Sequence, residues 1–173
     1  MPVDKRELLG FLELVDEQLD RGIRVNAVGG TAMTLLGLKA STIDIDFDFS
    51  EEDAKTFKAV LEGISHGYKV DIFSEGYIFA QQLPPDYVDK CVPIKTKLER
   101  ISLYTIHPLD IVASKLGRLN DRDMQDIETC IRKHRLSKAD VIKRARQVEI
   151  SVNRPEDYSA NTKVVLERFF LKG

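Results

Sequence analysis

The sequence predicts an α+β fold, in which a mixed β-sheet core is flanked by helices and followed by a helical C-terminal extension. Short apolar segments typical of strands lie within residues 23–106, separated by helical patterns and by short turns. From Pro108 onward the pattern is helical. Strands separated by both kinds of connection favour a mixed sheet over a parallel one. We expect a core over residues 1–106 and a helical part over residues 107–173, packed on the core as one compact unit.

The N-terminal half predicts alternating helices and strands. Over residues 4–20 the apolar residues recur at helical spacing, with Asp4 at the N-cap position, Glu7 three residues later and Gly22 after the end. The elements expected next are a strand over 23–30 that ends in two glycines, a short helix over 31–38, a strand over 42–49, a helix from Ser50 to about Gly63, and a strand over 68–74.

The C-terminal half is expected to begin with strands and to continue as helices. The segment 77–83 is ambiguous, and two short strands are expected over 87–96 and 99–106, the first interrupted by Pro93. Three helices are then expected over 108–134, 137–148 and 156–171, with Pro108, Ser137 and Pro155 as start signals.

The composition is that of a soluble globular protein, with 43% hydrophobic and 31% charged residues in 173. No apolar run approaches the roughly 20 residues of a membrane span, and the N-terminus lacks the apolar segment of a signal peptide. The two cysteines, Cys91 and Cys130, lie far apart and without metal-ligand spacing. We expect a cytoplasmic protein with reduced thiols and no contact with a membrane.

The charges are unevenly distributed. Residues 1–89 carry 17 acidic and 8 basic side chains, whereas residues 90–173 carry 11 acidic and 18 basic ones. The basic excess concentrates in residues 131–147, where seven Lys or Arg accompany a single acid, Asp140. Such a run is usually a solvated helix face, and the alternative is a surface for tRNA, nucleotide phosphate or an acidic partner.

Three aspartates alternate along the strand expected over 42–49. Asp44, Asp46 and Asp48 fall on one face, with successive Cα atoms about 6.5–7 Å apart. Like charges at this spacing repel, so water or a cation is needed. An EF-hand loop is excluded, because Phe49 stands at the position of its glycine and Lys55 at that of its final glutamate.

An Asp-x-Asp pair on a strand suits two divalent cations about 3.5–4 Å apart, which is an arrangement for phosphoryl transfer. Asp44 and Asp46 are the candidate ligands, and Asp71, another acid in an apolar strand, is the candidate third carboxylate. The alternative for Asp48 and Asp71 is a charge on an edge strand that discourages aggregation. Asp48 is expected to face solvent or to support the other two, and Asp126 is a further candidate for completing the site.

A glycine pair precedes these acids. Gly29, Gly30 and Thr31 stand where a strand passes into a helix, and glycines there allow the backbone to approach a phosphate. The plain alternative is a tight turn. The motif is not a P-loop, because no Gly-Lys-Ser/Thr follows it. It is not a dinucleotide fingerprint either, because the G-x-G-x-x-G spacing is missing.

The order of these motifs resembles the signature of the DNA polymerase β-like nucleotidyltransferase superfamily: a strand ending in Gly-Gly-Thr, a short helix, then Asp-Ile-Asp. The resemblance implies that Gly29, Gly30 and Thr31 hold the triphosphate. It also implies that Asp44 and Asp46, with Asp71 as third carboxylate, bind two Mg²⁺ or Mn²⁺ ions.

The segment "LDIVASKLGRLNDRDMQDI" (109–127) is similar to a helix of minimal nucleotidyltransferases related to AbiEii-type toxins. This resemblance implies that Lys115 contacts nucleotide phosphates and that Asp123 is an essential site residue. On a continuous helix Asp123 would fall within the apolar stripe, where a carboxylate needs a partner. The alternatives are an edge lysine for Lys115 and a salt bridge between Arg122 and Asp126.

The resemblance implies transfer of a nucleoside monophosphate from an NTP to a hydroxyl of tRNA, protein or a small molecule, with Mg²⁺. It further implies a place in a toxin–antitoxin or defence system, with a toxin or antitoxin as partner. The alternative is a non-catalytic module of the same fold that binds a nucleotide or a partner protein.

Overall fold

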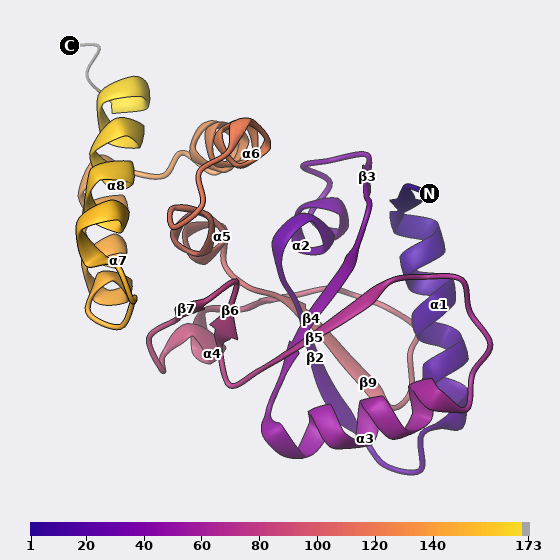
Figure 1. Cartoon of the computed structure of the whole chain (residues 1–173). Helices are drawn as coiled ribbons and strands as arrows, with labels where there is room; N and C mark the ends of the chain where they lie inside the picture. Colours follow the sequence, from indigo (N-terminus) through magenta and orange to yellow (C-terminus); the bar gives the residue numbers. More distant parts are fainter. Residues whose placement is uncertain (171–173) are drawn as a thin grey trace. The chain divides into compact units, whose positions relative to one another are not determined.

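The computed structural model of the chain describes residues 1–170 (Figure 1). Its internal contacts divide it into two compact units. The first contains residues 1–76 and 90–106, and the second contains residues 77–89 and the chain from His107 onward. The segment 77–89, which the sequence placed in the core region, therefore groups with the helices.

The first unit contains a mixed sheet with the strand order β5-β4-β2-β9-β8. Strand β4 (Ile45–Phe49) pairs antiparallel with β2 (Ile23–Ala27) and parallel with β5 (Val70–Ser74). Strand β9 (Ile101–Thr105) pairs parallel with β2 and antiparallel with β8 (Val92–Pro93). The predicted α+β class with a mixed sheet is confirmed.

The helices of the first unit begin at the caps that the sequence indicated. At the start of α1, the Asp4 carboxylate accepts the N–H of Glu7, and the Glu7 carboxylate accepts the N–H of Asp4. Ser50 accepts the N–H of Asp53 at the start of α3. The remaining elements of this unit are β1 (Val3–Asp4), α1 (Lys5–Gln18), α2 (Gly29–Leu35), β3 (Ser41–Thr42), which pairs with β1, and α3 (Glu51–Glu62).

The core of the first unit lies on one face of β4. Phe47 and Phe49 point to this face and pack on Phe57 of α3, with ring centroids 5.8 and 4.7 Å from that of Phe57. Because side chains alternate along a strand, the opposite face carries Asp46 and Asp48. The burial of the phenylalanines therefore fixes the direction in which the acids point.

The second unit begins with a hairpin of β6 (Tyr77–Ile78) and β7 (Gln81–Gln82). Its two turn residues, Phe79 and Ala80, have φ angles of 50° and 64°. A two-residue hairpin turn with two positive φ values is a type I′ turn, which usually takes Asn or Gly. An aromatic residue and an alanine are unusual here, which explains why the sequence pattern of this segment was ambiguous.

The strand predicted over 87–96 is wrong in its first half. Residues Tyr87–Lys90 form the single helical turn α4, whose Tyr87 N–H donates to the carbonyl of Pro84. The prolines before the turn favour this chain reversal. In the second half, Val92–Pro93 pairs with β9, and the Ile94 N–H donates to the Leu103 carbonyl at 2.9 Å.

The helix predicted over 108–134 is interrupted. Helix α5 (Pro108–Lys115) ends early, Leu119 has a φ of 51°, and α6 (Asp121–Lys133) starts anew at the N-cap Asn120. Asn120 was a recognisable N-cap signal within the apolar pattern. The last two helices agree with prediction as α7 (Lys138–Glu149) and α8 (Pro155–Phe170), and residue 171 lies outside the described residues.

One residue of the basic segment is part of the core of the second unit. The Arg144 side chain is only 3% exposed and forms ion pairs with Asp110 of α5 and with Asp86, at 2.8 Å from Asp86 Oδ1. Burial lowers the pKa of Arg144, but hydrogen bonds and the charge of Asp110, followed by those of Asp86, outweigh it and raise the pKa above its usual value. The segment is therefore not a purely solvated face.

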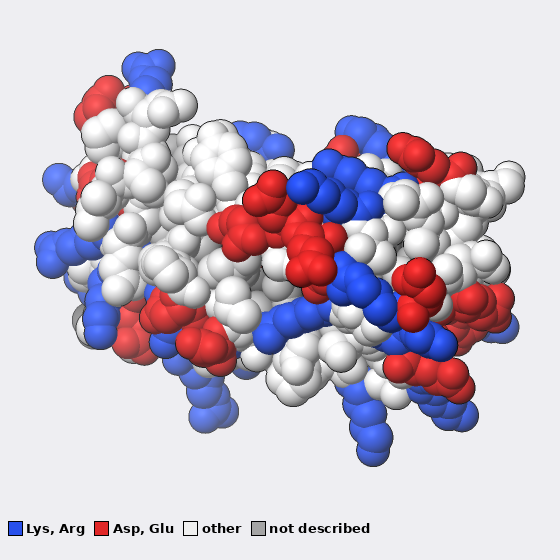
Figure 2. Space-filling model, turned by 90° about the horizontal axis from the view of Figure 1, so that it is seen from below, with Lys and Arg blue, Asp and Glu red and all other residues white. Residues whose placement is uncertain are grey.

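The surface of the first unit mixes both charges. Figure 2 shows acidic and basic side chains interspersed over the face on which α3 lies in Figure 1. On α3 itself, Lys55 pairs with Glu51 at 3.6 Å. Within residues 1–170, no helix has the length and apolar character needed to cross a membrane.

We expect Arg144→Met to lower the free energy of unfolding by about 3–5 kcal/mol, because it leaves Asp110 buried without its cation. Arg146→Met, an exposed position on the same helix, is the matched control and should change it by less than about 0.5 kcal/mol. Urea unfolding followed by circular dichroism measures both. Equal losses for the two variants would contradict a structural role for the buried pair.

Candidate functional site

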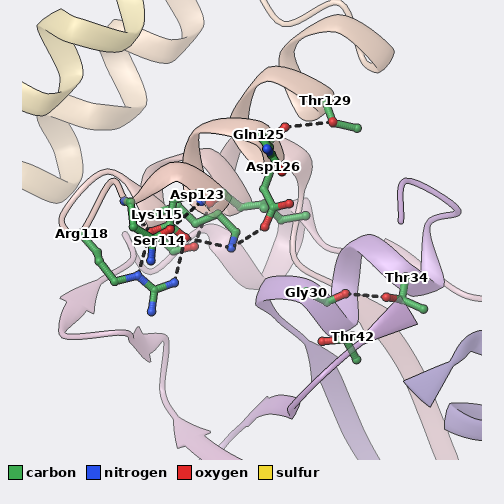
Figure 3. Close-up of polar contacts among 12 residues, drawn as sticks. Gly30, Thr34, Thr42, Ser114, Lys115, Arg118, Asp123, Gln125, Asp126 and Thr129 are labelled. Carbon is green, nitrogen blue, oxygen red and sulfur yellow. Dashed lines mark hydrogen bonds and ion pairs between the residues drawn. The ribbon is translucent and has the colours of Figure 1, made fainter. Parts of the chain in front are cut away.

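The glycine turn lies between β2 and α2. Gly29 has a φ of 54°, a value that glycine adopts readily. A Cβ on Gly30 would lie 2.7 Å from Thr42 Oγ1, so glycine is required by the close approach of β3. The Gly30 carbonyl accepts the hydroxyl of Thr34 at 2.8 Å (Figure 3). Both glycines are therefore explained by the backbone geometry of the turn.

Thr31 connects this turn to the acidic strand. Its buried hydroxyl donates to the Asp44 carbonyl at 3.2 Å and accepts the Asp46 N–H at 2.9 Å. The Thr42 hydroxyl donates to the same Asp44 carbonyl at 2.8 Å. The Thr31 side chain thus holds the backbone of the two predicted metal ligands, a role that the sequence did not indicate.

The three predicted metal ligands lie on or next to two neighbouring strands. Asp46 of β4 is the register partner of Asp71 of β5, so their side chains stand next to each other about 4.8 Å apart at the backbone. The strand predicted over 42–49 is broken by a bend at Ile43 and Asp44, so Asp44 lies just before β4, near enough to Asp71 for one lysine to contact both. Asp46 is 7% exposed, whereas the side chains of Asp44 and Asp71 are 40% and 42% exposed.

A lysine compensates two of these carboxylates. Lys69 Nζ lies 3.8 Å from Asp44 Oδ2 and 3.9 Å from Asp71 Oδ2. Its ammonium group is thus shared by two of the predicted ligands. Lys69 was missed, although its position two residues before Asp71 places it on the same strand face.

The donors fit a divalent cation by their chemistry, because carboxylate oxygens are the ligands that Mg²⁺ prefers. Within residues 1–170, no three side chains of the types His, Cys, Asp and Glu already lie close enough to hold a metal ion together. The Lys69 side chain, 69% exposed, is free to swing toward solvent. Metal binding would therefore require Lys69 to leave and the carboxylates to converge.

Asp48 does not face solvent. It is 0% exposed, and its Oδ1 accepts the N–H of Gly76 at 3.0 Å, in the turn that follows β5. Strand β4 lies between β2 and β5, so the alternative of an edge-strand charge is wrong for Asp48 as well. The carboxylate helps to hold the turn at Glu75 and Gly76, which have φ angles of 55° and 77°.

The second unit contains a separate cluster of charges around Asp123 (Figure 3). Asp123 is 0% exposed, and Arg118 binds both of its carboxylate oxygens, at 2.7 and 2.8 Å. Its Oδ2 also accepts the N–H of Asn120, and the Asn120 side chain accepts the N–H of Asp123. Asp123 therefore caps α6, and Arg118 is a partner that the sequence did not indicate.

Lys115 is shared by two acids of α6. Its Nζ lies 3.0 Å from Asp126 Oδ2 and 3.5 Å from Asp123 Oδ1, and the residue is 6% exposed. The alternative of a lysine that extends into solvent is therefore wrong. The expected pair of Arg122 with Asp126 is wrong too, since Arg122 is exposed and Asp126 pairs with Lys115.

Burial raises the pKa of Asp123, but the hydrogen bonds from Arg118 and then the charge of Lys115 outweigh it. The pKa of Asp123 therefore lies below its usual value. Its carboxylate stays ionised, held by two cations and by the helix cap. The cluster forms across the break between α5 and α6, so it does not require the continuous helix that the sequence predicted.

Residues 6–170 match the model of a family described as nucleotidyltransferases of unknown function (DUF6036). The chain belongs to this family. The predicted membership of the nucleotidyltransferase superfamily is thereby confirmed, while the AbiEii-type branch is not specified by the match. No match was found among curated proteins.

A solved structure with a similar fold is that of an antigenic nucleotidyltransferase-like protein from Paracoccidioides brasiliensis. The TM-score is 0.53 at 15% sequence identity, and the alignment covers 98% of this chain and 99% of that one. This likeness supports the nucleotidyltransferase-like fold and no particular activity.

We expect Gly30→Ala to lower the free energy of unfolding by about 1–3 kcal/mol, because the new Cβ would overlap the Thr42 hydroxyl. Thr42→Ala removes that oxygen, so adding Gly30→Ala to a Thr42→Ala protein should cost clearly less. A double-mutant cycle from urea unfolding measures the difference. Strictly additive effects would contradict the close contact as the reason for the glycine.

We expect Asp123 to make stability depend on pH. Since its pKa is lower in the folded protein, its contribution is fully present above the unfolded pKa of about 4 and is lost as pH falls through the folded value. Asp123→Asn should flatten the acid side of a plot of unfolding free energy against pH. An unchanged pH dependence would show that Asp123 makes no such contribution.

Proposed function

We propose that this protein transfers a nucleoside monophosphate from an NTP to an acceptor hydroxyl with Mg²⁺ or Mn²⁺. The observation that carries the proposal is the connection of the glycine turn to the acidic strand through Thr31. The turn proposed to orient the phosphates and the carboxylates proposed to hold the counterion would then belong to one continuous piece of the first unit. Membership of the nucleotidyltransferase family supports this chemistry.

In the proposed site, Asp44, Asp46 and Asp71 hold the two divalent ions. When bound, such ions neutralise charge on the phosphate oxygens and lower the pKa of a coordinated hydroxyl. Asp46 is the best oriented of the three, because β4 is paired on both sides and Thr31 binds its N–H. The half-exposed Asp44 and Asp71 have room to adjust toward the ions.

In the transfer step, the acceptor oxygen forms a bond to the α-phosphorus, the bond from that phosphorus to the bridging oxygen breaks, and pyrophosphate leaves. We assign the acceptor proton to a carboxylate oxygen of Asp71. The backbone N–H groups at Gly29, Gly30 and Thr31 are proposed to orient the phosphates. In the second unit, taken by itself, Lys115 stays a proposed ligand of nucleotide phosphate, with its ammonium group held by Asp123 and Asp126.

A pocket of about 620 Å³ in the first unit is the proposed place of the acceptor. Asp44 and Lys69 line it, together with the stacked rings of His66 and Tyr68 and the exposed side chain of Ile43. Stacked rings next to a carboxylate suit an acceptor that brings a flat or apolar group beside its hydroxyl. A tRNA, a protein or a small molecule remains the proposed acceptor, within the cytoplasm and a toxin–antitoxin or defence system.

The second candidate function is a non-catalytic module that binds a nucleotide or a partner protein. The bridge from Lys69 to Asp44 and Asp71 favours it, because it satisfies the carboxylates without a metal. Incubation with labelled NTPs separates the two functions. Tight nucleotide binding without incorporation into tRNA, protein or small molecules would favour the binding module.

We expect Asp44→Asn to abolish transfer, with a loss of at least about a thousandfold, since a neutral amide is a poor ligand for Mg²⁺. The control is Asp20→Asn, which neutralises an exposed carboxylate of the same unit. Label incorporation from each NTP is measured in both variants. Transfer retained by Asp44→Asn would rule out the proposed metal site.

We expect Lys69→Met to bind Mn²⁺ a few-fold more tightly than the wild-type protein, because the competing ammonium is gone. The size follows from the small contribution of exposed ion pairs. Lys58→Met, on the exposed side of α3, is the matched control. Isothermal titration with Mn²⁺ alone measures this, and weaker binding by Lys69→Met would mean that the lysine supports the metal instead.

A further inference from the structure

A small pocket in the second unit lies beside Lys115. It has a volume of about 220 Å³ and is lined by Phe79, Gln81, Ser114, Lys115 and Arg118. This is smaller than the roughly 300–1,000 Å³ of a pocket that encloses a whole ligand, so it fits one part of a nucleotide. Its residues come from the β6–β7 hairpin and from the end of α5 and the loop after it.

Gln81 is the unusual residue of this pocket. It is 7% exposed, and its Oε1 is buried without a hydrogen-bond partner among the described residues. A buried acceptor that makes no hydrogen bond costs roughly 1–3 kcal/mol, so folding alone does not explain its presence. An acceptor of this kind is satisfied by a ligand that donates an N–H or O–H group.

The surroundings hold Gln81 in this place. A Cβ on Gly117 would lie 1.9 Å from Gln81 Nε2 and 2.8 Å from its Cδ, so the amide occupies space that the glycine leaves open. The hairpin turn presents Phe79 to the same pocket through backbone angles that are costly for a non-glycine residue. The unpaired Gln81 oxygen and the strained backbone of Phe79 thus both lie at this pocket.

We propose that this pocket of the second unit binds the nucleoside part of a nucleotide, with Gln81 Oε1 accepting a hydrogen bond from a ribose hydroxyl or a base amine. Phe79 forms its apolar wall. The inference rests on the proposed function and names the residue that reads the nucleoside. It makes Gln81 a specificity-determining residue, because an analogue that lacks the donor leaves the acceptor unsatisfied.

The first measurement is the affinity of the wild-type and Gln81→Leu proteins for each NTP with Mg²⁺, by isothermal titration. We expect Gln81→Leu to weaken the preferred NTP about tenfold, the effect of one hydrogen bond. Gln82→Leu is the matched control, since its side chain points to the other face of the hairpin. A wild-type protein that binds no NTP would contradict the proposed function itself, whereas equal affinities of wild type and Gln81→Leu would overturn only this inference.

The second measurement uses ligands that separate the sources of the donor. The affinities of a 2′-deoxy, a 3′-deoxy and a deaminated NTP are each measured for both proteins. The analogue that lacks the donor recognised by Gln81 should bind wild type and Gln81→Leu with equal affinity. Inorganic tripolyphosphate, which has no nucleoside, should bind both proteins alike. A tenfold loss for tripolyphosphate would overturn the inference, because the amide would then be contacting phosphate.

The third measurement is stability without ligand. If Gln81 served the fold, Gln81→Leu would lower the midpoint of urea unfolding; we expect the midpoint to stay or rise, since the variant removes an unsatisfied acceptor. Gly117→Ala should displace the amide and weaken the preferred NTP as Gln81→Leu does, while Gly10→Ala, where a Cβ meets nothing within 4 Å, should not. A destabilised Gln81→Leu protein with unchanged nucleotide affinity would overturn the inference.

Discussion

The hydroxyl of Thr31 is the contact on which the proposed site depends. It donates to the Asp44 carbonyl and accepts the Asp46 N–H, and so it joins the glycine turn to the acidic strand. The close approach of Gly30 to Thr42 holds the same junction from the other side. Two glycines, two threonines and the strand backbone therefore act as one structural element, and the direction of the carboxylates follows from it and from the buried phenylalanines on the opposite face.

In each unit one lysine contacts two carboxylates, in different environments. Lys69 is exposed and bridges Asp44 and Asp71, at distances where the ammonium is easily released. Lys115 is buried against Asp123 and Asp126. Removing a partner from the exposed bridge costs little, whereas removing one from the buried cluster leaves an uncompensated charge. The first arrangement suits exchange with a ligand and the second suits a fixed geometry.

Local signals predicted much of the fold. Asp4 and Ser50 mark helix starts in the sequence and in the structure, because capping depends on neighbouring residues. The predictions that were wrong concerned residues whose environment depends on distant contacts or on competing local signals. Asp48 looked like a solvent-facing acid until the turn at Gly76 supplied its donor, and Arg144 looked like surface charge until Asp110 and Asp86 appeared as its partners.

The same limit holds for the candidate site. Alternation along a strand was enough to propose Asp44 and Asp46, and an acid within a second apolar strand was enough to propose Asp71. Lys69 and Gln81 became visible only from the contacts of each side chain in the structure. The bridge made by Lys69 has a further consequence. Because the acidic strand carries its own counterion, the sheet does not need a metal to fold, so chelation would remove a bound ion without unfolding the chain. In the proposed site, folding and metal loading would thereby be separate events.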